Sequence, residues 1–175
     1  RMQLKPIVLA DMTAVYGISF EFGGKMGIGL ISIIIGIITI LIDQITKALI
    51  VSNLYRDEVV LIDKILSFTY VENYGAAWGI FNKYDILLKI LIPIFILVII
   101  VFLIKSKPTK FETFAGSLVV GGAIGNYIDR LIRGYVVDFI DFKFWPVFNF
   151  ADICIVVGCI MLVISLIRRE NNDEN

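Results

Sequence analysis

The sequence contains no histidine, and this absence removes several kinds of enzyme chemistry. Without an imidazole there is no Ser-His-Asp or Cys-His catalysis, and most zinc sites are excluded. Cysteine is scarce too: Cys154 and Cys159 are the only two, and both lie in the last apolar segment. Because they are five residues apart and lack a basic neighbour that would favour a thiolate, we expect them to be small core or lipid-facing side chains.

The sequence also has little charge. Only 18% of its 175 residues are charged, the formal net charge is zero, and 58% of the residues are hydrophobic. Together with a mean hydropathy of +0.88, this composition indicates a membrane protein rather than a soluble one. A neutral chain gives no reason to expect nucleic acid as a partner, and the length suits a single domain.

Four apolar segments could each cross about 30 Å of hydrocarbon as a helix. The third contains Gly121 and Gly125, a GxxxG pair that lets neighbouring helices approach closely. We therefore expect a mainly α membrane protein with one four-helix domain over residues 27–169. The predicted spans are residues 27–51, 86–104, 111–132 and 149–167.

The two ends of the chain fit this domain poorly. Residues 1–26 hold a short, interrupted apolar run that cannot span a bilayer, and they lack the features of a signal peptide. We expect an added or fused leader there, with a natural start at Met26. The polar residues 170–175 predict a disordered tail.

Basic residues predict how the chain is oriented. Loops on the cytoplasmic side of a membrane are enriched in lysine and arginine. The loop after the second span and the end of the fourth span are basic, which places both termini in the cytoplasm. Residues 52–82 and 134–148 would then lie on the outer side. The basic residues are Lys105, Lys107, Lys110, Arg168 and Arg169.

The two outer segments differ in pattern. Residues 52–82 show partial alternation of β-branched and aromatic side chains, which predicts short strands. Their end, Asn73 to Gly79, fits either a substrate-facing surface or an ordinary interfacial loop. Residues 134–148 predict a loop with a short extended piece around Asp138. Aromatic anchors at the membrane surface would be Phe144, Trp145 and Phe148.

Carboxylates gather between the last two spans, at Asp129, Asp138, Asp141 and Asp152. Carboxylates near a bilayer are costly and usually functional. Two of them at close range share a proton, so that one deprotonates water while the other protonates a carbonyl oxygen. We predict an aspartyl catalytic pair formed by Asp138 and Asp152, although spacing alone also allows Asp129 as the partner of Asp152.

The carboxylates of this stretch also have simpler interpretations. Asn149 and Asp152 have the spacing of a capping box at a helix start. Asp129 and Arg130 are adjacent and point apart, which favours a structural ion-pair network for Asp129. Asp141 fits a solvated loop carboxylate.

Polar residues also occur within the spans. Asp43 and Lys47 lie four residues apart near the end of the first span, as a simple ion pair or as a group that orients other residues. In the third span, one helical face collects Asn126, Asp129, Arg130 and Arg133.

Five short motifs resemble those of the bacterial lipoprotein signal peptidases, or signal peptidase II, and occur in that family's order. They are DQITK at residues 43–47, NYGAAWG at 73–79, GGAIGNYIDR at 121–130, VVDF at 136–139 and FNFAD at 148–152. The resemblance covers about residues 27–169.

The resemblance implies a fold and an activity. It implies four transmembrane helices with a small extracytoplasmic β-cradle and an interfacial loop, in the bacterial cytoplasmic membrane. It also implies a monomeric aspartyl endopeptidase that removes the signal peptide from prolipoproteins, cutting before a cysteine that carries diacylglycerol. Besides this substrate and membrane lipid, the expected partners are globomycin-type inhibitors, and no metal or organic cofactor is expected.

The resemblance further implies roles for individual residues. The catalytic pair would be Asp138 and Asp152. The remaining motif residues would bind substrate or support the pair. Asn126, Arg130 and Asn149 would bind and orient the substrate backbone and hold the pair, and Asp129 would support the fold around them. Asn73 and Gly75 would line the substrate cleft, and Asp43 and Lys47 would fix the first helix against it.

Two other functions compete with this one. Buried carboxylates with an arginine would also suit a proton-coupled carrier or channel component. Four spans without an internal repeat argue against a typical transporter. A non-enzymatic assembly subunit, held together through the GxxxG face, is the other alternative.

Overall fold

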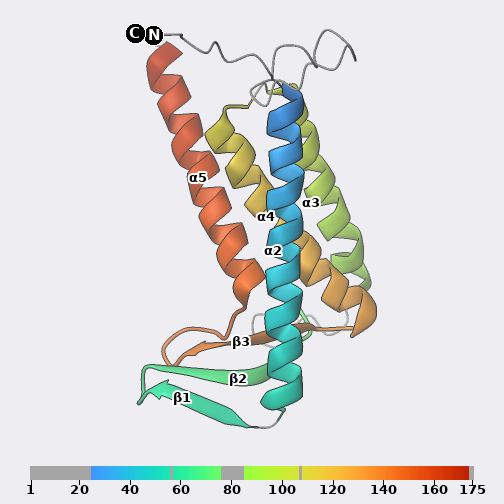
Figure 1. The fold of residues 1–175 in the computed structure, drawn as a ribbon, viewed down its shortest axis with the longest axis vertical. Coiled ribbons are helices and arrows are strands. Elements are labelled where there is room, and N and C mark those ends of the chain that lie inside the picture. Colours follow the sequence, from blue (N-terminus) through green and yellow to red (C-terminus); the bar gives the residue numbers. More distant parts are fainter. Residues whose placement is uncertain (1–24, 56, 76–84, 107, 174–175) are drawn as a thin grey trace, which may run out of the picture.

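The computed structural model describes residues 25–55, 57–75, 85–106 and 108–173. A bundle of helices stands on a small sheet, which crosses one end of the bundle (Figure 1). The elements run in the order α2 (Lys25–Asn53), β1 (Glu58–Ile62), β2 (Leu66–Asn73), α3 (Asp85–Lys105), α4 (Lys110–Ile132), β3 (Val136–Phe142) and α5 (Phe150–Asp173).

The helices occur where the four apolar segments predict them, with one correction at the end of the chain. Helix α5 continues to Asp173, so the disordered tail predicted for residues 170–175 is wrong for residues 170–173. The polar end of the chain extends a helix that is already formed, and each added residue contributes a backbone hydrogen bond without a new nucleus. Residues 1–24 of the predicted leader lie outside the described residues.

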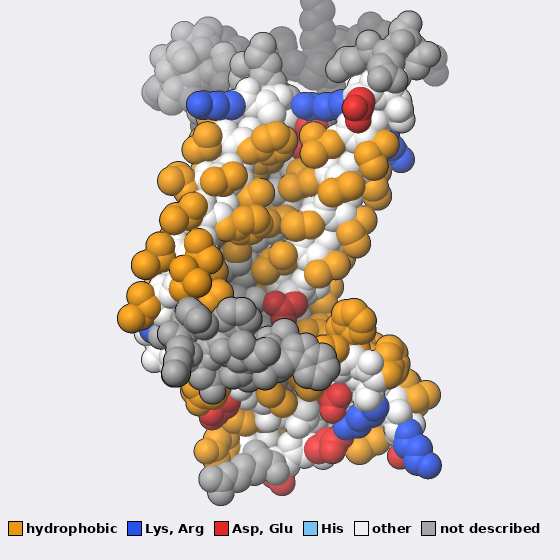
Figure 2. Space-filling view, turned by 180° about the vertical axis from the view of Figure 1, so that it is seen from behind, with side chains coloured by type: hydrophobic (Ala, Val, Ile, Leu, Met, Phe, Trp, Pro, Cys, Tyr) orange, Lys and Arg blue, Asp and Glu red, His pale blue; other side chains and the backbone are white. Residues whose placement is uncertain are grey.

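By length and composition, three of the described helices could cross a membrane, namely α2, α3 and α5. Their outward faces are covered by hydrophobic side chains between the sheet and the far helix ends (Figure 2). This composition is that of a membrane protein. Helix α4 is not among the three, because glycines and polar side chains occupy much of its surface. It packs against all three of the others and forms the centre of the bundle.

Glycines on α4 set how closely the helices approach, as the GxxxG pair predicts. A Cβ atom on Gly121 would lie 2.9 Å from the carbonyl oxygen of Gly36 in α2, and one on Gly125 would lie 2.5 Å from the Asp43 carboxylate. On the opposite side, a Cβ on Gly122 would lie 2.5 Å from the carbonyl oxygen of Ala151 in α5. The prediction of close helix packing through these glycines is confirmed.

We expect Gly122→Ala to destabilise the protein by about 1–3 kcal/mol, because the added methyl group meets backbone atoms that cannot move independently. Thermal unfolding in detergent measures this loss. Gly29→Ala is the matched control, since a Cβ there has no atom of the described residues within 4 Å and alanine favours a helix by about 1 kcal/mol. Equal unfolding temperatures for the two variants would contradict this packing.

The sheet is antiparallel, with the strand order β1-β2-β3. Strands β1 and β2 confirm the strands predicted within residues 52–82. The prediction for residues 134–148 was too weak, because a full strand of seven residues replaces the short extended piece in a loop. Its pairing with β2 joins segments about 65 residues apart, such as Val71 and Asp138, and a local pattern does not reveal such a pairing.

A small core joins the sheet to the helix bundle. Ile50 at the end of α2 packs with Val137 and Phe139 of β3, and all three side chains are buried. Beyond this core, Phe144 and Trp145 are largely exposed, whereas Phe148 stacks on the ring of Phe142. The core fixes β3 against the helix ends, and so it fixes Asp138 there as well.

Candidate active site

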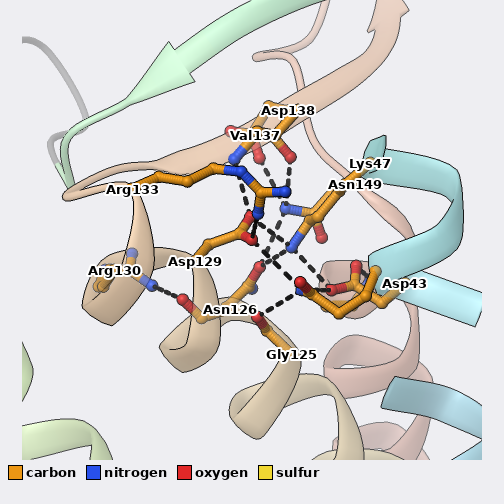
Figure 3. A network of polar contacts seen from close by, with 12 residues as sticks. Asp43, Lys47, Gly125, Asn126, Asp129, Arg130, Arg133, Val137, Asp138 and Asn149 are labelled. Carbon is orange, nitrogen blue, oxygen red and sulfur yellow. Dashed lines mark hydrogen bonds and ion pairs between the residues drawn. The ribbon is translucent and has the colours of Figure 1, made fainter. Parts of the chain in front are cut away.

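The predicted site residues meet where the helix ends reach the sheet, and most belong to one network of hydrogen bonds and ion pairs (Figure 3). Helix α2 contributes Asp43 and Lys47, helix α4 contributes Asn126 and Asp129, and strand β3 contributes Asp138. The network also includes Asn149 and Asp152 at the start of α5 and Asn73 at the end of β2.

Asp138 is buried, with only 2% of its surface exposed. Its two carboxylate oxygens each accept a hydrogen bond from a side-chain amide, one from Asn73 at 2.8 Å and one from Asn149 at 2.7 Å. Burial, and secondly the negative charge of Asp152, raise the pKa of Asp138 to about 6, and these two amide hydrogen bonds oppose the rise. Asp138 therefore holds a proton more readily than an ordinary aspartate.

Asp152 lies in the first turn of α5 and is half-buried. It exchanges hydrogen bonds with Asn149: the Asn149 backbone N–H donates to the Asp152 carboxylate at 3.2 Å, and the Asp152 N–H donates to the Asn149 side-chain oxygen at 3.0 Å. This is the reciprocal pattern of a capping box, as the spacing suggested. The other carboxylate oxygen accepts from the Asn126 amide at 2.8 Å.

Asn149 connects the two carboxylates. Its side-chain amide donates to Asp138 and its backbone N–H donates to Asp152. Asp152 can therefore take part in the capping box and lie next to Asp138 at the same time. The reason is that Asn149, the residue that caps α5, also binds the Asp138 carboxylate. Asn126 reinforces this arrangement, since its oxygen accepts from the Asn149 amide at 3.1 Å while its own amide binds Asp152.

A buried cation, Lys47, contacts residues that hold the two carboxylates Asp138 and Asp152 in place. The ammonium group of Lys47 lies 2.8 Å from the Asp43 carboxylate, 3.1 Å from that of Asp129 and 2.8 Å from the Asn126 side-chain oxygen. The side chains of Lys47, Asp43 and Asp129 have no exposed surface. Lys47 thus neutralises charge in the interior and orients the amide of Asn126 toward Asp152.

The contacts of these charged residues bear on both of their interpretations. Asp43 and Lys47 form the ion pair that their spacing predicts, and they also bind other elements: Lys47 donates to the Asn126 side-chain oxygen, and Asp43 accepts from the Ala151 N–H. Asp129 belongs to a structural network, because it binds Lys47, Arg133 and the backbone N–H of Val137. It thereby ties α4 to α2 and β3.

Two predicted site residues, Arg130 and Gly75, lie at the margin of the network, and the carboxylate Asp141 lies apart from it. Arg130 is half-buried at the edge of the network, where its guanidinium donates to the backbone carbonyl of Asn126 at 3.2 Å (Figure 3). Gly75 follows Asn73 and donates its N–H to that side chain at 2.9 Å. Asp141 forms an ion pair with Lys143 on the sheet, 2.8 Å away. Residues 76–79 of the NYGAAWG motif lie outside the described residues.

Two residues of the network were missing from the predicted site. Gln44 donates from its side-chain amide to Asp43, to Asp129 and to the backbone carbonyl of Gly125, at 3.1–3.2 Å. Arg133 pairs with Asp129 four residues earlier. The helical spacing of Arg133 was a usable signal, whereas Gln44 lies next to the ion pair in sequence and has no periodic pattern of its own.

The sequence matches a known protein family over most of its length. The family model described as signal peptidase (SPase) II matches residues 35–168, which is most of the chain. This chain belongs to the signal peptidase II family. The matched region contains every residue of the network just described.

Individual relatives of this signal peptidase II chain match it over most of their length. A lipoprotein signal peptidase of Halothermothrix orenii is 37% identical over 138 residues, which cover 78% of this chain and 95% of the relative. One of Caldicellulosiruptor bescii is 40% identical over 139 residues, covering 78% and 89%. A solved bacterial membrane enzyme matches the fold with a TM-score of 0.75 at 35% identity, covering 81% of this chain and 90% of that one.

The raised pKa of Asp138 predicts a pH-dependent effect on stability in this signal peptidase II chain. Asp138 titrates near 3.8 when unperturbed and near 6 in the folded protein, so the folded state loses stability as the pH rises between these values. This difference corresponds to about 3 kcal/mol. Between about pH 4 and about pH 8 we expect Asp138→Asn to gain up to about that much stability relative to the unsubstituted protein.

Thermal unfolding in detergent across this pH range measures the gain. The amide substitution also alters hydrogen bonds to Asn73 and Asn149, but that loss does not depend on pH and so cancels in the comparison. Asp141→Asn on the same strand is the control. An Asp138→Asn variant whose stability follows the same pH dependence as the unsubstituted protein would contradict the raised pKa.

Proposed function

We propose that this protein is an aspartyl endopeptidase that removes the signal peptide from diacylglyceryl-modified prolipoproteins, cutting before the lipidated cysteine. Membership of the signal peptidase II family supports a peptidase over a proton-coupled carrier. The observation that supports the aspartyl mechanism most strongly is the bridging of Asp138 and Asp152 by one residue, Asn149. No step of this mechanism requires a metal or an organic cofactor.

In the proposed mechanism the two carboxylates hold one proton between them, and Asp138 carries it at the start. Asp152 takes a proton from water, and the water oxygen attacks the scissile carbonyl carbon while Asp138 protonates the carbonyl oxygen. When the resulting tetrahedral intermediate breaks, the C–N bond is lost and Asp152 gives its proton to the leaving amine. Asp138 recovers its proton from the same intermediate, so the pair returns to its starting state.

The surrounding residues would hold the two carboxylates and the substrate in the positions that this reaction needs. Asn126 and Asn149 fix the two carboxylates relative to one another, and Asn73 with Gly75 forms the adjoining wall of the cleft. Arg130, at the edge of the network, would bind the substrate backbone. Rigid support of this kind lowers the cost of reaching the reactive geometry.

We further propose that the sheet end of the bundle faces outward. Basic side chains gather at the helix ends away from the sheet (Figure 2): α3 ends with Lys105, α4 begins with Lys110, and Arg168 and Arg169 lie near the end of α5. Basic residues favour the cytoplasmic side. In this orientation the chain is a multi-pass protein of the bacterial cytoplasmic membrane, with α4 as its fourth span. The catalytic pair would lie near the outer surface, where globomycin-type inhibitors would bind a monomer.

A paired-substrate assay tests the proposed substrate. The purified protein in detergent is given the same prolipoprotein with and without the diacylglyceryl group, and mass spectrometry identifies the products. We expect cleavage of the modified form only, at the bond before its cysteine. Cleavage of both forms at equal rates, or at another bond, would refute the proposed specificity.

The two cysteines provide a further prediction. Cys154 is buried and Cys159 is half-buried in α5, and both are free. The double variant Cys154→Ser with Cys159→Ser should retain cleavage, because neither thiol takes part in the proposed step. The cleavage assay measures this directly, and a well-folded but inactive double variant would refute the inert role that we assign to both.

A further inference from the structure

An apolar groove runs along the bundle on the side of the network away from the sheet. Helices α2 and α3 each pack on α4, but within the described part of the chain they do not pack on one another. The space between them has a volume of about 850 Å³. Small side chains form much of its wall, among them Gly29, Ser32 and Gly36 of α2 and Gly116, Ser117 and Gly121 of α4.

The length of the groove matches one leaflet of a membrane. Its wall extends from Gly29 to Ile40 on α2 and from Thr113 to Ile124 on α4. At 1.5 Å per residue each wall is roughly 17 Å long, and half of a 30 Å hydrocarbon core is about 15 Å. The groove ends where the polar network begins, since Asp43 and Gly125 follow within the next turn of each helix.

Basic residues lie near the end of the groove that is away from the polar network. Ile104 and Pro108 line the groove there, and the exposed lysines Lys105 and Lys110 come one and two residues after them in sequence. A lysine near an anionic membrane surface attracts acidic headgroups. The same lysines disfavour the apolar helix of a signal peptide as the occupant, because such a peptide begins with a positively charged region on the cytoplasmic side.

We propose that this groove binds an acyl chain of an anionic phospholipid from the leaflet at the basic end, with Lys105 and Lys110 binding its phosphate. The chain would lie against the glycines of α2 and α4, and the lysines would select an acidic headgroup over a zwitterionic one. This site is separate from the catalytic pair, and its test does not use cleavage.

Photolabelling in nanodiscs tests the proposal. The full chain is placed in phosphatidylcholine doped with phosphatidylglycerol that carries a photoreactive group in its acyl chain, and labelled peptides are mapped by mass spectrometry. We expect labelling within residues 29–40 and 113–124 to exceed that of the outward face of α5. An excess of unlabelled phosphatidylglycerol should compete with the label, and phosphatidylcholine should not.

Substitutions separate the groove from its basic end. Gly29→Leu with Gly36→Leu should reduce groove labelling to the level of α5. Within the described part of the chain, a Cβ at these positions meets at most one atom, 3.9 Å away, so the larger side chains would extend into the groove. Val163→Leu, on the exposed face of α5, is the control. Lys105→Gln and Lys110→Gln should each weaken the preference for phosphatidylglycerol about fivefold, the contribution of one basic residue, whereas Arg168→Gln should not.

Three outcomes would overturn the proposal. If a zwitterionic lipid labels the groove equally well, the groove contacts lipid without selecting an acidic headgroup. Displacement of the label by a prolipoprotein would assign the groove to substrate. If labelling rises when dimers are diluted to monomers, the groove is covered by a second copy of the chain rather than by lipid. Unfolding temperatures of all variants confirm that changes in labelling do not reflect loss of the fold.

Discussion

Replacing either member of the proposed catalytic pair, by Asp138→Asn or Asp152→Asn, should lower the rate of cleavage at least about a thousandfold. Asparagine keeps the size of the side chain and can still accept a hydrogen bond, but it can neither take a proton from water nor supply one to the carbonyl oxygen. Initial rates with a diacylglyceryl-modified prolipoprotein measure the loss. We expect kcat to fall much more than KM rises, because the substrate contacts remain.

Asp141→Asn is the matched control for these two variants. Asp141 lies on the same strand as Asp138, three residues further on, but it pairs with Lys143 at the surface of the sheet. Its substitution should leave the cleavage rate within about twofold, since exposed ion pairs contribute little. Retention of cleavage by Asp138→Asn would instead move the catalytic role to another carboxylate.

The largest effect on stability should come from Lys47→Met, at about 3–5 kcal/mol. The Lys47 side chain is fully buried between Asp43 and Asp129, and both partners have no exposed surface. Methionine fills a similar volume but leaves two buried carboxylates without their shared cation. It also removes the donor that orients Asn126, so we expect cleavage to fall as well. Thermal unfolding in detergent and the cleavage rate report the two effects.

Lys143→Met is the control for this prediction. Lys143 also pairs with two carboxylates, those of Glu58 and Asp141, but it is 36% exposed, so its substitution should lower the unfolding temperature far less than Lys47→Met does. Adding Asp43→Asn to Lys47→Met should recover part of the lost stability, because it restores the balance of buried charge. Fully additive losses, or equal losses for the two lysine variants, would contradict the role assigned to Lys47.

Much of the fold was predictable because its signals are local in sequence. Apolar segments long enough to span a membrane located the helices, and the glycines at 121 and 125 indicated close packing. The spacing of Asp43 and Lys47 predicted their ion pair, which the structure contains at 2.8 Å. Among the described residues, the extent of β3 and the helical end of α5 differed from the prediction, because strand pairing and the continuation of a formed helix depend on residues outside the local window.

The site was less predictable, because its contacts join distant parts of the chain. Spacing left Asp129 and Asp138 equally eligible as partners of Asp152. The choice depends on β3, which lies against the ends of α2 and α4, and on Lys47, which engages Asp129 from 82 residues away. The dual role of Asn149, as helix cap and as bridge to Asp138, likewise requires the fold.

A carboxyl titration shows whether Asp138 and Asp152 act as one interacting pair. The protein is labelled with ¹³C at the aspartate carboxyl carbon, and Asp138→Asn identifies the signal of Asp138. We predict a pKa of about 6 for Asp138, and a lower value, still above 3.8, once Asp152→Asn removes the neighbouring charge and leaves the burial. An Asp138 signal that titrates near 3.8, or that does not respond to Asp152→Asn, would contradict the pair.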